Sequence, residues 1–176
     1  MTRAHIVSVA LLALSAVAGC QAESFDRINE DGISFAALDS WAMHRERGSV
    51  VLSGGPAGFD KTRIVVRAVD VPQSQRNQTR RSPRRVFDAT KQVLEALPDA
   101  RVIGPFPDVH PSFRSARFSL SFASKDTGAR TQRRHVVLVA PDQSQIVHVF
   151  VTAPDDTIDQ SAAVFDEVVA SLRKES

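Results

Sequence analysis

Alternation of apolar and polar side chains predicts strands in the second half of the chain. Residues 114–122 alternate strictly, as is typical of a strand with one buried face. That face would carry Ala116, Phe118, Leu120 and Phe122. Two further apolar runs, 135–140 and 145–152, flank Pro141-Asp142-Gln143-Ser144, where proline and aspartate favour a tight reversal. These two runs are therefore predicted to form an antiparallel hairpin.

The first half of the chain contains three shorter runs of β-branched and aromatic residues. They cover residues 33–36, 49–52 and 62–69, and each is predicted to be a strand. The glycine-rich segment 54–58 separates the last two and has the composition of a connection between strands. It lacks the Lys-Ser/Thr end of a phosphate-binding loop, so a hairpin connection is the favoured interpretation.

Two segments have a helical period instead. Ser82-Pro83 provides an N-cap and a proline at the first helical position, and the apolar spacing that follows predicts a helix from Pro83 to Leu97. The second helix is predicted over residues 158–173. Its apolar residues recur at helical spacing and form a stripe along one face. Arg173 and Lys174 lie at the C-terminal end, where the helix dipole favours cations.

The order of these elements predicts an α+β fold, an antiparallel β-sheet flanked by helices. Neighbouring strands are close in sequence, which favours antiparallel pairing over parallel crossovers. The expected core residues are Phe118, Leu120, Phe122, Val136, Leu138, Val147, Val149 and Phe165.

Composition excludes several classes of protein. The 176 residues are 43% hydrophobic and 24% charged, as in one globular domain with a substantial core. The formal charge of +2 is too balanced for a basic nucleic-acid-binding surface, so no nucleic-acid partner is expected. A single cysteine excludes an intramolecular disulfide scaffold and a cysteine-rich zinc domain.

The N-terminus has the pattern of an export signal. Arg3 and His5 precede a short apolar run over residues 6–18, which ends in Val17-Ala18-Gly19-Cys20. This tetrapeptide resembles the lipobox of bacterial lipoproteins, in which the cysteine is diacylated and becomes the mature N-terminus. Residues 1–19 are then the signal peptide, 20–31 a lipidated tether and 32–176 a single domain. Gln21 after the cysteine indicates the outer membrane, and a cut near Ala18 or Ala22 that leaves a free thiol is the alternative.

The whole predicted domain resembles the PsbP-like α/β/α sandwich, a fold shared by the photosystem extrinsic protein and bacterial lipoproteins of the DcrB type. Ile33-Ser34-Phe35 leads to Trp41, and the last helix ends in Ser171-Leu172-Arg173, as in that family. The proline that commonly precedes the tryptophan is replaced by Leu38-Asp39-Ser40. The resemblance implies a fold and a non-enzymatic assembly or binding module, and it implies no specific activity.

Two histidines of the predicted hairpin form a candidate site. Centring the turn on Asp142-Gln143 places His135 opposite Phe150 and His148 opposite Val137, so both imidazoles lie on one sheet face. As diagonal neighbours their Cα atoms would be roughly 7–8 Å apart, close enough to share a metal ion or a proton. No third ligand is visible in the sequence. A helix that covers two hydrogen-bonded imidazoles is therefore the favoured alternative.

A second candidate is the acid–histidine pair Asp108 and His110, which could act on a nucleophilic serine. The flanking prolines predict a loop, and no G-x-S-x-G elbow supplies the serine. A solvated loop is the favoured interpretation.

The segment 73–85 contains five arginines and no acidic residue. The cluster comprises Arg76, Arg80, Arg81, Arg84 and Arg85. The last two fall in the first helical turn, where the dipole disfavours cations unless an anion is bound there. Phosphate, carboxylate, anionic lipid or an acidic partner would suit this arginine cluster. A flexible, solvated loop is the alternative, and it is slightly favoured.

Taken together, these patterns predict a membrane-anchored, non-enzymatic lipoprotein of the bacterial envelope, facing the periplasm. It would bind a protein partner or an anionic envelope component and would need no cofactor. The alternative is an envelope hydrolase that uses His110 with Asp108, or a metal-binding protein that uses His135 with His148.

Overall fold

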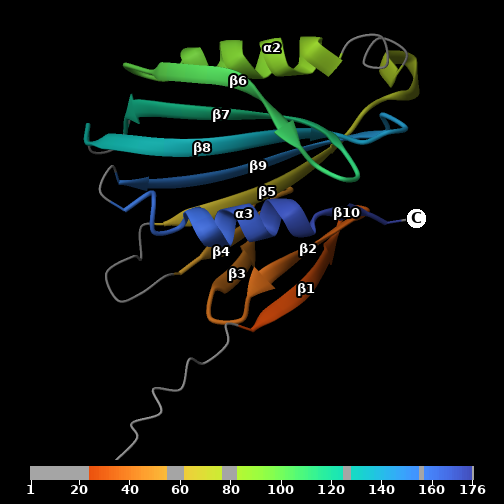
Figure 1. The fold of residues 1–176 in the computed structure, drawn as a ribbon, viewed down its shortest axis with the longest axis horizontal. Helices are drawn as coiled ribbons and strands as arrows, with labels where there is room; N and C mark the ends of the chain where they lie inside the picture. Colours follow the sequence, from red (N-terminus) through yellow and green to blue (C-terminus); the bar gives the residue numbers. More distant parts are fainter. Residues whose placement is uncertain (1–23, 55–61, 77–82, 125–127, 155–156, 176) are drawn as a thin grey trace, which may run out of the picture.

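A computed structural model describes residues 24–54, 62–76, 83–124, 128–154 and 157–175. Its main feature is a seven-stranded antiparallel sheet of order β3-β4-β5-β9-β8-β7-β6 (Figure 1). The strands are β3 (Ala42–Arg45), β4 (Val50–Ser53), β5 (Arg63–Asp70), β6 (Arg101–Val109), β7 (Arg114–Ala123), β8 (Arg130–Val139) and β9 (Gln145–Pro154). The predicted α+β class and the antiparallel sheet are confirmed.

A second, three-stranded sheet has the order β1-β2-β10. It comprises β1 (Phe25–Glu30), β2 (Ile33–Leu38) and β10 (Arg173–Lys174). The sequence placed residues 25–30 in the tether, and this boundary is wrong because the segment pairs with β2 along its full length. Strand β1 is held by backbone hydrogen bonds at an edge and buries little side-chain area, so it lacks the alternation that reveals a strand.

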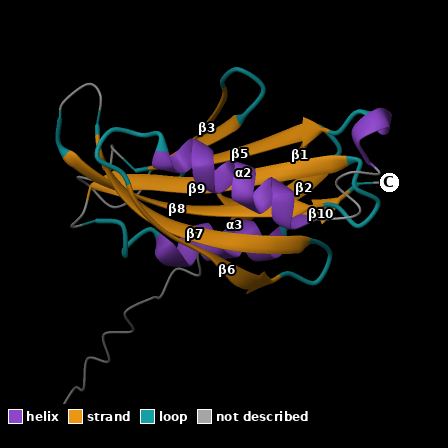
Figure 2. Ribbon diagram, turned by 90° about the horizontal axis from the view of Figure 1, so that it is seen from above, coloured by secondary structure: helices purple, strands orange, loops and turns teal. Residues whose placement is uncertain are grey.

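Two helices lie on opposite faces of the large sheet, α2 (Pro83–Glu95) and α3 (Ala162–Ser171) (Figure 2). Helix α3 is shorter than predicted at both ends. Residues 157–161 form turns before it, and Leu172 leaves the helix so that β10 can pair with β2. Ser82, the expected N-cap of α2, lies outside the described residues. None of the helices in the described ranges is long and apolar enough to span a membrane.

The core forms two layers, one on each face of the large sheet. Helix α3, the small sheet and one face of the large sheet enclose Phe35, Trp41, Val149 and Phe165. On the other face, α2 packs through Leu94 against apolar side chains of β7 and β8. All eight predicted core residues are buried. They divide between the layers, with Phe118, Leu120 and Phe122 in the α2 layer and the other five in the α3 layer.

Strand β6 is the longest of the strands that the sequence pattern missed. Pro107 and Pro111 predicted a loop here, but Pro107 lies within β6, together with Pro105. The strand is at the edge of the sheet, where proline is tolerated. Its pairing with β7 is interrupted between Ile103 and Phe106. Gly104 lies at this irregularity with φ of 118°, and a Cβ there would lie 2.8 Å from the Arg117 carbonyl oxygen, so a larger residue would not fit.

Candidate functional site

The hairpin of β8 and β9 brings His135 and His148 together with the predicted register. His135 is paired with Phe150, and His148 with Val137. The two imidazoles meet through His135 Nε2 and His148 Nδ1, which are 3.1 Å apart. The expected common face and close approach of the two rings are confirmed.

The environment keeps both imidazoles neutral. Burial lowers the pKa of His148 to about 4, with a smaller contribution from the positive charge of Arg67. Burial holds the pKa of His135 well below its usual value, and His148 and Arg133 act in the same direction. Because one imidazole must donate to the other, a single proton lies between the two rings, and His135 Nδ1 is buried without a hydrogen-bond partner.

The pair has no metal-site partners in the part of the chain that the structure describes. No group of three or more histidine, cysteine, aspartate or glutamate side chains there is arranged to hold a metal ion. What the geometry shows is a hydrogen-bonded pair of neutral imidazoles at the base of a cavity.

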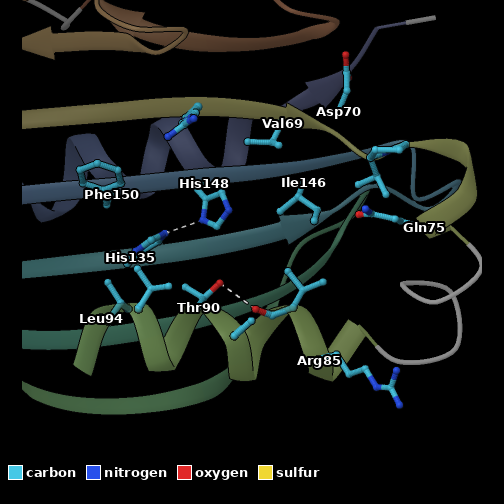
Figure 3. Close-up of a pocket in the computed structure, with 16 residues that line it drawn as sticks. Val69, Asp70, Gln75, Arg85, Thr90, Leu94, His135, Ile146, His148 and Phe150 are labelled. Carbon is cyan, nitrogen blue, oxygen red and sulfur yellow. Dashed lines mark hydrogen bonds between the residues drawn. The ribbon is translucent and has the colours of Figure 1, made fainter. Parts of the chain in front are cut away.

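This cavity opens between α2 and the sheet and has a volume of about 670 Å³ (Figure 3). Helix α2 packs over β6 and β7, and the cavity follows its open edge above β5 and β9. Its lining is mainly apolar, and polar groups come from the histidine pair, Arg67, Asp70, Gln75, Arg85 and Thr90. The volume lies in the range of small-molecule binding sites, which typically combine apolar walls with a few polar groups. We call it the α2 cavity.

A second groove of about 510 Å³ continues along the same sheet face. Arg67 and Phe150 line both it and the α2 cavity, so the two join. Four arginines line the groove, and one acidic side chain, Glu46, accompanies them. We call it the arginine groove; its arginines are Arg47, Arg63, Arg67 and Arg133.

Asp108 and His110 do not form the solvated loop that the sequence favoured. Asp108 belongs to β6 and forms an ion pair with Arg117 at 3.7 Å. His110 is 9% exposed, and both of its ring nitrogens are engaged. The Ser112 amide donates to Nδ1, so Nε2 carries the proton and donates to the Val169 carbonyl at 3.0 Å, near the end of α3. Burial lowers the pKa of His110. The neutral ring links the end of β6 to α3 through its hydrogen bonds and is not placed as a base beside a serine.

The arginine cluster is only partly described, because Arg80 and Arg81 lie outside the described residues. Arg76 donates from Nε to the Val71 carbonyl at 3.0 Å, which ties the helical turn at 73–76 to the end of β5. Arg84 lies 3.9 Å from Asp88 on the exposed side of α2. Arg85 lies at the start of α2 and lines the α2 cavity. The structure thus places one member of the cluster at the cavity.

Sequence reasoning missed the arginine groove and most of the cavity lining. A relevant pattern was present in β5, where Arg63, Val65, Arg67 and Val69 alternate with core residues. This alternation predicted a strand, but it was not recognised as a row of arginines on the open face of the sheet. The partner strand supplies Phe150 and Thr152, but the pairing of β5 with β9 joins segments far apart in sequence and is invisible to local periodicity.

No protein-family model and no curated protein matches this sequence. The fold is nevertheless similar to cyanobacterial PsbP (CyanoP) from Synechocystis, with a TM-score of 0.54 and 13% identity, covering 92% of this chain and 98% of that one. The chain has a PsbP-like fold. LpqN of Mycobacterium tuberculosis, described as involved in cell envelope biogenesis, shares the fold with a TM-score of 0.58 and 14% identity, over 87% of this chain and 91% of that one.

A third structure with this fold is the Saccharomyces cerevisiae Ran-binding protein Mog1p. Its TM-score is 0.52 at 10% identity, over 87% of this chain and 96% of that one. Identities this low establish the fold and leave the function to be argued from the site.

Trp41, which the sequence shares with the PsbP-like family, has a structural role here. Trp41 is buried and packs closely on Gly54. A Cβ on that glycine would lie 2.9 Å from the indole ring, so this contact requires a residue without a side chain.

Proposed function

We propose that this chain is a membrane-anchored, non-enzymatic lipoprotein of the bacterial envelope whose PsbP-like domain binds an anionic, partly apolar envelope component in the α2 cavity. The observation that carries the proposal is the cavity itself. It combines apolar walls with Arg67 and Arg85, and Asp70 is the acidic residue that accompanies them in the lining.

The proposed envelope location and anchor rest on the N-terminal pattern. Cys20 follows a short apolar signal and would carry the lipid, and Gln21 favours the outer membrane, with the domain in the periplasm. The similarity to LpqN, a protein involved in cell envelope biogenesis, supports an envelope role.

The proposed non-enzymatic character rests on the geometry of the candidate catalytic groups. Both nitrogens of His110 are used for backbone contacts, and Asp108 is paired with Arg117. His135 and His148 are neutral and hydrogen-bonded to each other. In this proposal the four side chains shape and stabilise the domain, and its activity is binding.

The arginine cluster supports the same proposal. Arg84 and Arg85 lie in the first turn of α2, where bound anion would offset the unfavourable interaction with the helix dipole. Arg85 reaches the cavity lining, so an anionic component could be attracted first by the cluster and then enter the cavity.

The test is to fill the cavity without unfolding the domain. Ala89 lines the cavity from α2, and Gln92 lies on the same helix, exposed and outside the lining. We expect the wild-type lipoprotein to bind an environment-sensitive apolar fluorophore and to retain acidic lipid extractable by organic solvent. Ala89→Phe should lose both properties, while Gln92→Phe should keep both.

Equal fluorophore and lipid binding by wild type and Ala89→Phe would contradict a binding role for the cavity. Crosslinking to an envelope protein that is unchanged in Ala89→Phe, with no bound lipid in wild type, would instead favour the protein-partner alternative.

A further inference from the structure

Arg133 has an unusual environment for a charged side chain. Its guanidinium carbon lies 4.5 Å from the centre of the Phe150 ring and 5.1 Å from that of Phe122. Nε donates to the Thr152 hydroxyl at 3.1 Å. Desolvation by burial lowers its pKa. A largely buried arginine is normally paired with a carboxylate, yet no ion pair involves Arg133 in the described part of the chain.

The contacts orient this guanidinium and leave its outer edge available. The two aromatic rings lie close to the guanidinium carbon, and the hydrogen bond to Thr152 uses Nε. The terminal nitrogens Nη1 and Nη2 are the donors that form paired hydrogen bonds to a phosphate or carboxylate. An arginine held in this way is preorganised for an oxyanion because little side-chain freedom remains to be lost on binding.

The surroundings of Arg133 add positive charge. Strand register places Arg63 and Arg133 on either side of Thr152, across β5, β9 and β8. The acidic side chain in the lining, Glu46, is already bonded to Arg63 at 2.8 Å. Arg67 is exposed and forms no ion pair within the described ranges. The arginine groove therefore carries excess positive charge that no described protein group neutralises.

The groove is also continuous with the apolar cavity. Phe150 packs on Arg133 and lines both compartments, and Arg67 lies at the same junction. A ligand with a charged end and an apolar end would fit across this junction. Its charged end would meet the arginines, and its apolar end would lie along α2.

We propose that the arginine groove is an oxyanion subsite, in which Arg133, assisted by Arg67, binds the phosphate or carboxylate head group of an amphiphile whose apolar part occupies the α2 cavity. This inference rests on the proposed function and names the chemistry of the ligand's head group. It places that group on strands β8 and β5, away from the arginine cluster of residues 73–85.

The experiment compares three probes on the purified full-length protein by titration calorimetry, below the micelle concentration of each amphiphile. The probes are dodecyl phosphate, the neutral detergent dodecyl maltoside and inorganic phosphate. We expect dodecyl phosphate to bind at least tenfold more tightly than either other probe, because it engages both compartments.

The variants assign the preference to particular residues. Arg67→Gln and Arg133→Gln should each reduce the preference for dodecyl phosphate over dodecyl maltoside by about tenfold. Arg133→Lys should show nearly the same loss as Arg133→Gln, because an ammonium group cannot form the two parallel hydrogen bonds of a planar guanidinium. Arg101→Gln is the matched control, since Arg101 is exposed on β6 outside both compartments. If Arg133→Gln does not fold, the exposed Arg67 still tests the proposal.

Three different results would contradict the subsite, the amphiphilic ligand and the proposed function respectively. An unchanged preference in Arg67→Gln and Arg133→Gln, or a loss confined to the double variant Arg84→Gln/Arg85→Gln, would overturn the subsite and leave cavity binding standing. Equal affinity for inorganic phosphate would overturn the amphiphilic ligand. Failure of both amphiphiles to bind wild type would overturn the proposed function as well.

Discussion

At the scale of single residues, the buried histidines have structural roles that follow from desolvation. His110 joins the end of β6 to α3, and His135 and His148 share a proton beneath the α2 cavity. In each case burial favours the neutral imidazole, which has one donor and one acceptor nitrogen. His110 uses both nitrogens, whereas His135 bonds through Nε2 alone.

The low pKa of His148 predicts a loss of stability in acid. Its pKa is about 4 in the folded protein and near 6.5 in the unfolded chain, so the unfolded chain binds more protons between these values. The free energy of unfolding should therefore be highest above pH 6.5 and fall as the pH approaches 4. For this partly buried group, a pKa shift of this size corresponds to a loss of about 3 kcal/mol at most in the free energy of unfolding.

Urea unfolding of wild type and His148→Gln at several pH values between 4 and 7.5 measures this effect. The variant should be less stable than wild type at pH 7.5, and the difference should shrink as the pH falls. His44→Gln is the control, since His44 is exposed on β3. Parallel pH profiles for wild type and His148→Gln would show that His148 titrates normally in the folded protein.

At the scale of elements, the large sheet has two different faces. The α3 face is closed by a helix and by the small sheet, whereas α2 covers only part of the other face and leaves the cavity and groove open. Burial alternates along β9, whose side chains divide between the sealed α3 core and the face that carries the cavity and groove.

Truncation of one aromatic residue on each face tests this arrangement. Phe165 projects from α3 into the core and is fully buried, and Phe122 is 8% exposed on the opposite face of the sheet. Phe165→Ala and Phe122→Ala should each lower the free energy of unfolding by roughly 3–5 kcal/mol. Val93→Ala is the control because Val93 is 71% exposed, and it should have little effect. Near-wild-type stability of both phenylalanine variants in urea titrations would contradict the two-layer core.

At the scale of the whole molecule, the small sheet brings the first described residues into the fold. Strand β1 begins at Phe25, so only a few residues separate the folded domain from Cys20. If Cys20 carries the anchor, the domain is held close to the membrane surface.

We predict that Cys20→Ala abolishes membrane attachment. Wild type should partition with membranes and carry acyl mass on its N-terminal residue, whereas the variant should be found unmodified in the soluble fraction or as the unprocessed precursor. Fractionation and mass spectrometry of the N-terminal peptide measure both properties. Membrane attachment without acyl mass would show that another feature anchors the chain.

Elements with a local sequence pattern could be predicted from the sequence alone. Strict alternation identified β7, turn chemistry at Asp142-Gln143 set the β8–β9 register and the histidine pair, and helical spacing after Pro83 identified α2. In these segments the side chains that must be buried lie close together along the chain, so periodicity reports the structure.

Features that depend on pairing between distant segments became visible only in the folded chain. The edge strands β1 and β6 are held by their partners and show little pattern of their own, because an edge tolerates polar residues and proline. The arginine groove likewise exists because β5 pairs with β9, which brings Arg67 beside Phe150 and Arg133. Periodicity shows which side of a strand faces inward, but the residues that meet across a sheet are determined by strand order, and strand order is a property of the whole fold.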